Sequence, residues 1–287
     1  LIFGEMGEGM KQPRVSIIIL NWNGLNDTIE CLESLKKITY NNYEVIVVDN
    51  ASSSDDVVVL RKKFGKYIKI IENDKNYGFA KGNNIAMRKV MKEEKSKYVL
   101  LLNNDTVVDP VFLDELVKTG ESDEKVGIVG GKNYYYNIGR KKEKVWYSGG
   151  SIRWWSGTII HDNDQKDNLS KETDYIVGSL MLIRVGLIKK IGIFYSKFFV
   201  YCEDVDLCLR AKKEGYRAVY NPNSIIWHKV GKSSGLGSPF FIFYSVRNRF
   251  WLIRRNYNST KYYLFIIAFL FYKQPIWLFK FLFNGQF

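Results

Sequence analysis

The first hundred residues alternate between short apolar runs and amphipathic segments, and this alternation limits the fold more than any other feature. Four runs rich in Val and Ile are apolar on both faces, as expected for buried strands: Val15–Leu20, Tyr43–Val48, Tyr67–Ile71 and Tyr98–Leu102. Helical spacing of apolar residues separates them, at Asn26–Lys37, Asp55–Phe64 and Ala80–Glu94. Such alternation predicts an α/β fold, with a mostly parallel sheet covered by helices.

Asn or Asp follows each predicted strand, directly after three of them and one residue later after Tyr67–Ile71. The four clusters are Asn21-Trp22-Asn23, Asp49-Asn50, Asn73-Asp74 and Asn103-Asn104-Asp105. In open α/β sheets, ligands bind beyond the carboxyl ends of the strands, where the strand order reverses. The repeated pattern therefore predicts a polar ligand site at one edge of the sheet.

The second half of the chain is less regular. Short strands and turns are expected from about residue 120 to 173, further strands at Asp174–Arg184 and Arg217–Tyr220, and a helix at Glu203–Glu214. Three cysteines (Cys31, Cys202 and Cys208) with no CxxC or Cys/His pairing indicate buried thiols in a reducing compartment.

Asp105 follows a fully apolar strand, where a carboxylate can hold a divalent metal together with a ribose or diphosphate. The alternative is a helix N-cap or an Asx-turn ahead of Pro110, because Asp and Asn favour such turns. Asp109 is the better candidate for the cap, since it directly precedes the proline.

A carboxylate pair, Glu203-Asp204, opens the predicted helix Glu203–Glu214. One of the two can act as a general base, with its pKa set by burial and by its neighbours. A helix start is the alternative interpretation, because capping and the helix dipole also favour acidic residues there.

The sequence contains two histidines. His228 closes the apolar segment Ser224–Trp227, and a metal site anchored by one carboxylate needs further ligands. A packed or surface residue is the alternative for His228. His161 lies in the polar stretch His161–Asp167, which we predict to be solvated surface.

The segment Asn76–Asn84 carries two glycines, Gly78 and Gly82, that allow close backbone approach to a phosphate or sugar. It lacks the Gly-Lys-Ser/Thr ending of a Walker A loop, and no Gly-x-Gly-x-x-Gly follows the first strand. These observations argue against a P-loop NTPase and a nicotinamide enzyme.

The net charge of +13 is unevenly placed, since no acidic residue follows Glu214. Two aromatic helical segments are expected there, Pro239–Tyr257 and Thr260–Phe283. The uninterrupted apolar run Tyr262–Tyr272 is shorter than the roughly twenty residues of a spanning helix. The pattern favours an in-plane amphipathic segment on an anionic bilayer, and it disfavours nucleic acid.

Taken together, five stretches in this order resemble the family-2 glycosyltransferases, and within them the rhamnosyltransferase-like branch. They are Val15–Asn23, Val47–Ser52, Asn76–Asn84, Leu101–Asp105 and Tyr201–Leu207. The resemblance implies a GT-A fold, the Rossmann-like fold of nucleotide-diphospho-sugar transferases. It also implies inverting transfer from a nucleotide diphosphate sugar, most simply UDP- or dTDP-linked, with Mn²⁺ or Mg²⁺ as cofactor.

The same resemblance implies roles for individual residues. Asp49 resembles the acidic residue that contacts the nucleotide, with Asn21 and Asn50 beside it. Asp204 resembles the catalytic base, with Glu203 its partner or rival. The full expected set for the nucleotide sugar is Asn21, Asp49, Asn50, Asn76, Gly78, Gly82, Asn83, Asn104, Asp105 and Arg247.

For the metal, Asp105 resembles the last member of an Asp-x-Asp motif. His228 resembles a later metal-ligating histidine on a flexible loop continued by Lys229–Ser234. The first motif position is Asn103, so only Asp105 supplies charge, and the metal then depends more on the donor diphosphate. Arg247-Asn248 matches a recurrent Arg-Asn of this branch, expected near phosphate.

The expected organisation is a disordered leader (1–12), a catalytic domain (13–238) and membrane-associating helices (239–287). The nucleotide-binding half would be 13–119 and the acceptor half 120–238. The acceptor is expected to be a glycan, lipid-linked, in surface polysaccharide or glycoconjugate synthesis at the cytoplasmic face of the cell membrane. Alternatives are a catalytically degenerate transferase subunit and a sugar nucleotidyltransferase. The sequence leaves the oligomeric state open, a homo-oligomer included.

Overall fold

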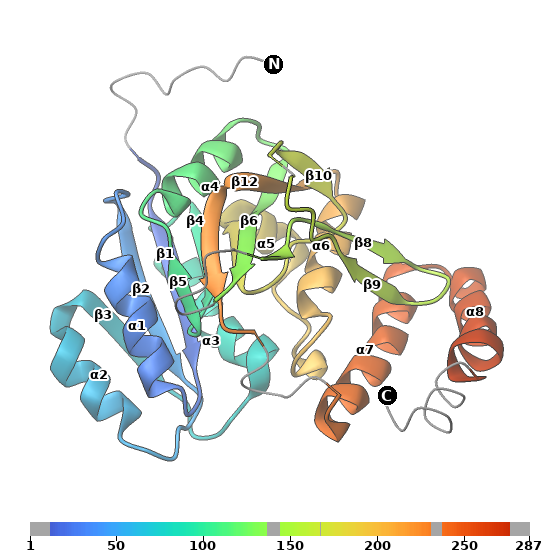
Figure 1. Ribbon diagram of the computed structural model, residues 1–287, viewed down its shortest axis with the longest axis horizontal. Helices are drawn as coiled ribbons and strands as arrows, with labels where there is room; N and C mark the ends of the chain where they lie inside the picture. Colours follow the sequence, from blue (N-terminus) through green and yellow to red (C-terminus); the bar gives the residue numbers. More distant parts are fainter. Residues whose placement is uncertain (1–11, 137–143, 167, 231–236, 276–287) are drawn as a thin grey trace.

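The computed structural model describes residues 12–136, 144–166, 168–230 and 237–275 (Figure 1). The predicted leader thus lies outside the described residues except for Gln12, as do most of the predicted loop Lys229–Ser234 and the end of the segment Thr260–Phe283. The N-terminal half contains β1 (Val15–Asn21), α1 (Leu25–Leu35), β2 (Tyr43–Asp49), α2 (Asp56–Phe64), β3 (Ile68–Glu72), α3 (Gly78–Glu93), β4 (Tyr98–Asn103), β5 (Thr106–Val108) and α4 (Phe112–Glu121).

The second half adds further strands, three long helices and a short fourth. Its elements are β6 (Val126–Tyr135), β7 (Val145–Tyr147), β8 (Gly150–Arg153), β9 (Thr158–His161), β10 (Lys171–Thr173), β11 (Leu180–Arg184), α5 (Val185–Ile191), α6 (Glu203–Lys213), β12 (Arg217–His228), α7 (Pro239–Asn256) and α8 (Ser259–Ala268). A π-helical turn, Phe269–Lys273, follows α8.

One sheet runs through both halves in the order β10-β12-β6-β11-β4-β1-β2-β3. Strands β4, β1, β2 and β3 are mutually parallel, and β12 is parallel to β6, whereas β11 is antiparallel to both of its neighbours. The order reverses at β1, which has β2 on one side and β4 on the other. The predicted α/β fold is confirmed, and the reversal lies where the polar clusters follow the strands.

Side chains of the central strands alternate between the two faces of the sheet. Ile17 and Ile19 pack with α1, α2 and α4, whereas Ile18 packs with α3, α5 and α6. This period of two explains why the strand segments are apolar on both faces. All three cysteines are free and buried, as the sequence predicts.

Two strand predictions need correction. The predicted strand Asp174–Arg184 begins only at Leu180, because the backbone before it is used elsewhere: the amide of Ile176 contacts the sulfur of Cys208, and the amide of Gly178 donates to Asp204. The predicted strand Arg217–Tyr220 continues to His228, with an irregularity between Asn221 and Ile225. Buried apolar residues in a tight turn have the same composition as a strand, which explains the first error.

Helices α7 and α8 pack at one side of the molecule, far from α1 and α2 (Figure 1). None of the helices within the described residues is both long and apolar enough to cross a bilayer.

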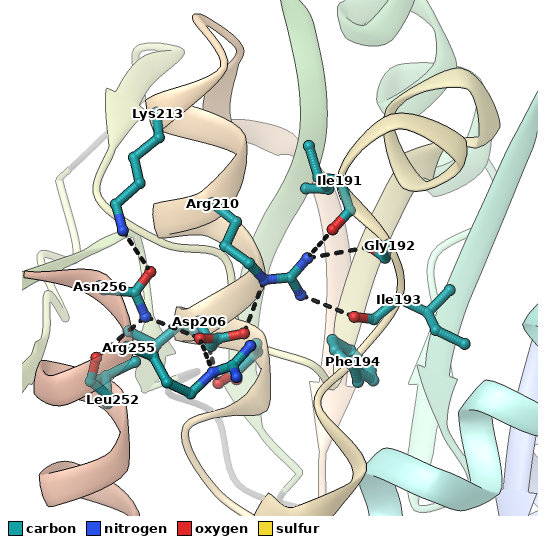
Figure 2. A network of polar contacts seen from close by, with 12 residues as sticks. Ile191, Gly192, Ile193, Phe194, Asp206, Arg210, Lys213, Leu252, Arg255 and Asn256 are labelled. Atoms are coloured by element: carbon teal, nitrogen blue, oxygen red, sulfur yellow. Dashed lines mark hydrogen bonds and ion pairs between the residues drawn. The ribbon is translucent and has the colours of Figure 1, made fainter.

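A buried carboxylate, Asp206, ties the C-terminal end of α7 to α6 (Figure 2). It accepts hydrogen bonds from Arg210 at 2.9 Å, from Arg255 at 3.2 Å and from the amide of Asn256 at 2.8 Å. Arg210 also donates to the carbonyls of residues 191–193. Because Asp206 is fully buried, these partners are what stabilise its charge.

Candidate active site

A cavity of about 630 Å³ opens at the carboxyl edge of the sheet. Part of its lining, which we call the polar wall, consists of Asn50, Asn76, Asn104, Asp105 and His228. Aromatic side chains make up much of the rest, including Trp146, Tyr175, Phe199, Phe240 and Phe241, and the ring of Trp146 lies 5.0 Å from that of His228. The predicted polar clusters after β1, β2 and β4 and the carboxylates of α6 thus meet around one space.

Behind the polar wall, Asn21 joins three neighbouring segments. Its amide donates to Asp49 and to Asp56, both at 2.8 Å, and its side-chain oxygen accepts from Thr28 at 2.8 Å. Asp49 also accepts from the amide and the hydroxyl of Ser52. Asn21 and Asp49 are buried, and neither is among the residues that line the cavity. They set the shape of the wall from behind.

Asn50 connects the end of β2 to the segment before α3. Its amide donates to Asn76 and to the carbonyl of Gly78, both at 3.2 Å, and Asn76 in turn accepts from the amide of Gly78 at 2.8 Å. Gly78 has φ +72°, and a Cβ there would lie 2.5 Å from the ring of Phe199, so glycine is required twice over.

Two further expected residues lie on the inner side of α3. A Cβ on Gly82 would lie 2.6 Å from Leu20, so this glycine allows α3 to pack closely on β1. Asn83 is buried and donates to the carbonyl of Phe79 within the same helix. Neither residue lines the cavity. Asn104 does, and it donates to Thr28 at 2.9 Å.

Asp105 and His228 face one another in the polar wall. Their Oδ1 and Nε2 atoms are 3.1 Å apart, and both side chains are nearly buried. The Oδ1 of Asp105 and the Nδ1 of His228 have no hydrogen-bond partner among the described residues. A carboxylate oxygen and an imidazole nitrogen in contact are donors that suit a divalent cation such as Mn²⁺.

The backbone around His228 is fixed on both sides. Its carbonyl accepts from the amide of Tyr136 at 2.9 Å, and the next amide, of Lys229, donates to the carbonyl of Asp105 at 3.0 Å. The ammonium of Lys229 lies 2.5 Å from both Asp27 and Glu30 of α1. Lys229 therefore anchors the end of β12 to α1 beside the Asp105–His228 pair.

Glu203 and Asp204 line the cavity from the first turn of α6. Asp204 accepts from the amide of Gly178 at 3.0 Å and from that of Val205 at 2.8 Å. Glu203 is 4% exposed, and its Oε2 has no hydrogen-bond partner in the described chain. Burial raises the pKa of both carboxyls, and the neighbouring Asp204 raises that of Glu203 further. A pair of this kind holds protons at pH values where exposed carboxyls have lost them.

Arg247 lies outside the residues that line the cavity. Its guanidinium donates to the carbonyls of Lys197 and Phe198, each at 3.0 Å, and lies over the ring of Trp251 at 4.4 Å. Arg247 therefore contacts the segment before α6 and not the cavity.

Several cavity residues were not found from the sequence. His161 is exposed at the end of β9, as the sequence predicts, but its ring also packs 5.2 Å from that of Trp146 and lines the cavity. Helix α7 contributes Phe241, Ser245 and Arg249. Their spacing of four residues places them on one helix face, a signal that the sequence does contain.

The sheet order and the helices that flank the sheet define a fold of GT-A type. A comparison of structures supports this fold: GalNAc-T7, solved with UDP, GalNAc and Mn²⁺, aligns with a TM-score of 0.68 over 84% of this chain and 48% of that chain, at 16% identity.

Residues 16–192 match the glycosyl transferase family 2 model, and the chain belongs to this family. The rhamnosyltransferase WbbL of Escherichia coli is 28% identical over 72% of this chain and 80% of its own length. A low-salt glycan biosynthesis hexosyltransferase of Haloferax volcanii is 27% identical over 70% of this chain and 62% of its own. The chain spans 25%, 62% and 66% of the lengths of three curated relatives that it matches.

The raised pKa of Glu203 predicts a pH dependence of stability. Because the native state keeps this proton where the unfolded chain has released it, stability falls as the pH rises from the ordinary value of 4.5 toward the raised native pKa. Glu203→Gln should remove that decline, about 1.4 kcal/mol for each unit by which the pKa is raised. Urea denaturation at pH 5 and at pH 7.5 measures it.

The exposed Glu124 supplies the control, since Glu124→Gln should leave the slope of stability against pH as in the wild type. An equal slope in the Glu203→Gln protein would show that Glu203 is ionised in the native state throughout this range.

Proposed function

We propose that this chain is an inverting, metal-dependent glycosyltransferase that transfers a sugar from a nucleotide diphosphate to a glycan acceptor. The observation that carries the proposal is the placement of two acidic sites in one cavity. The Asp105–His228 pair lies in the polar wall, and the Glu203–Asp204 pair lies on α6. Donor activation and acceptor deprotonation need two such separate sites.

The polar wall suits the donor. Asn50, Asn76 and Asn104 line the same cavity as Trp22, whose side chain is exposed, and together they offer a polar and aromatic surface for a nucleoside. Asn21 and Asp49 act from behind, because they fix the ends of β1 and β2. UDP- or dTDP-sugars are the donors we expect, and GalNAc-T7 was solved with UDP.

Asp105 and His228 would hold Mn²⁺ or Mg²⁺. The unpartnered Oδ1 of Asp105, 3.1 Å from a ring nitrogen of His228, fits such a group. The described residues contain no cluster of three or more His, Cys, Asp or Glu for a metal, so the remaining ligands would come from the donor diphosphate and water. When bound, the cation neutralises charge on the departing diphosphate.

Asp204 is the proposed base. The acceptor hydroxyl oxygen bonds to the anomeric carbon while the bond from that carbon to the diphosphate oxygen breaks, and the hydroxyl proton moves to Asp204. Attack opposite to the leaving group inverts the configuration. The two backbone amides bound to Asp204 fix its orientation, and its raised pKa makes it a stronger base than an exposed Asp. Glu203 would hold its proton and donate a hydrogen bond to a sugar hydroxyl.

The acceptor is proposed to be lipid-linked and presented at the cytoplasmic face of the cell membrane. Helices α7 and α8 and the following turn expose a set of large apolar side chains: Phe243, Tyr263, Leu264, Ile267, Leu270, Phe271 and Tyr272. Arg254 and Arg255 are exposed on the same pair of helices, and no acidic residue follows Glu214. This combination favours an anionic bilayer surface.

Donor binding tests the proposed function. UDP-glucose, dTDP-rhamnose and GDP-mannose are compared by thermal shift, with and without Mn²⁺. One of these nucleotide sugars should raise the melting temperature, and Mn²⁺ should enlarge the rise. Asp105→Asn should weaken binding in Mn²⁺ at least tenfold, because it removes the charged ligand, whereas Asp109→Asn should not.

A wild-type protein that is folded but binds none of these donors would contradict the proposal. The sugar released by slow hydrolysis of the bound donor should carry the opposite anomeric configuration, as read by proton NMR. Retained configuration would contradict in-line displacement.

Sedimentation with vesicles tests membrane association. Ile267→Glu combined with Phe271→Glu should weaken binding to phosphatidylglycerol vesicles at least tenfold, because it places charge where apolar side chains meet the bilayer. The control is Val58→Glu, which changes an exposed apolar residue of α2 on the distant side of the molecule (Figure 1). Equal sedimentation of both variants would exclude this face.

A further inference from the structure

The segment that leads into α6 has an unusual backbone. Phe199, Tyr201 and Cys202 have φ angles of 66°, 70° and 73°, in the left-handed region that residues other than glycine seldom adopt. Such a backbone conformation is unfavourable for these residues, and it persists only where surrounding contacts impose it. The next two residues are Glu203 and Asp204.

Helix α7 supplies contacts that impose this conformation. The amide of Asn248 lies 2.9 Å from the carbonyl of Phe198, 2.7 Å from that of Val200 and 2.8 Å from that of Tyr201. Arg247 adds its two hydrogen bonds, to Lys197 and Phe198. Asn248 is fully buried, so these carbonyls have no access to water at the contact.

The same segment also contacts the start of α3. The carbonyl of Phe199 accepts from the amide of Ala80 at 3.0 Å, and its ring packs on Gly78. Phe199 itself lines the cavity. Residues 198–202 therefore lie between the loop that precedes α3 and the carboxylates of α6, with α7 holding them from behind.

A second attachment of α7 to α6 does not involve this segment. Asn256, two turns after Asn248, is also a buried asparagine, and its amide donates to Asp206 at 2.8 Å (Figure 2). Asp206 retains Arg210 and Arg255 as partners without it. The two asparagines thus have separate roles. Asn248 supports residues 198–202, and Asn256 attaches α7 to α6.

We infer that Asn248 is a positioning residue for the Glu203–Asp204 pair: its hydrogen bonds hold residues 198–202 in the left-handed conformation that presents Asp204 to the cavity. The inference rests on the proposed function for the role of Asp204. Because α7 also carries the exposed Phe243, the support for the carboxylates comes from the helix that faces the proposed membrane.

The test compares Asn248→Asp with Asn256→Ala. Asn248→Asp keeps the shape of the side chain but removes both N–H donors. We expect the maximal rate of hydrolysis or transfer of the bound donor to fall about 100-fold, since a displacement of about 1 Å has that effect. Nucleotide affinity should stay within about threefold, and chymotrypsin should cleave after Phe199 or Tyr201 at least tenfold faster. Asn256→Ala should lower the melting temperature and change neither the rate nor the cleavage.

An unchanged rate in Asn248→Asp, or equal losses of rate in the two variants, would overturn the inference. If Asn248→Asp does not fold, Arg247→Met removes the hydrogen bonds to the carbonyls of Lys197 and Phe198 and the one to the side chain of Asn248. It should lower the rate about tenfold with faster cleavage. If the wild type acts on none of the three nucleotide sugars, the proposed function fails by itself. The rate of chymotrypsin cleavage after Phe199 or Tyr201 then tests the inference. An unchanged cleavage rate in folded Asn248→Asp would overturn it.

Discussion

The hydrogen bonds of Asn21 are the contacts on which the geometry of the cavity depends. This buried amide bridges two carboxylates, Asp49 and Asp56, that would otherwise repel each other with no donor between them. Its oxygen accepts from Thr28 of α1. The ends of β1 and β2 and the starts of α1 and α2 are therefore held together at the point where the strand order reverses. This arrangement positions the side chains of the polar wall.

The first turn of α6 shows how one stretch of sequence divides its carboxylates between structure and chemistry. All three acidic residues there gain from the helix dipole. Asp206 is surrounded by two guanidinium groups and an amide, so its charge is fully compensated. Glu203 and Asp204 have no such partners, and burial raises their pKa values. The carboxylate with ionic partners attaches α7, and the two without them face the cavity.

Much of the N-terminal half could be predicted from the sequence, because β-branched runs and Asn/Asp clusters mark β1, β2 and β4 directly. The polar wall of the cavity follows from the rule that parallel strands end at one edge. The aromatic part of the lining could not be predicted. His161 of β9 and Trp146 of β7 come from short strands that pair with different partners, and no local pattern records their contact. The pocket face of α7 was hidden because an aromatic helix is explained equally well by a bilayer.

Asp204 is the residue on which the proposed function depends most, as the group that would take the acceptor proton. The measurement that tests it directly is the single-turnover rate of Asp204→Asn with bound donor, taken beside its nucleotide affinity. The amide keeps the shape of the carboxylate but cannot accept the proton at neutral pH. A rate about 10²- to 10⁴-fold below that of the wild type, with unchanged affinity, is the predicted result. A rate within about tenfold of the wild type would contradict the assignment and direct attention to Glu203.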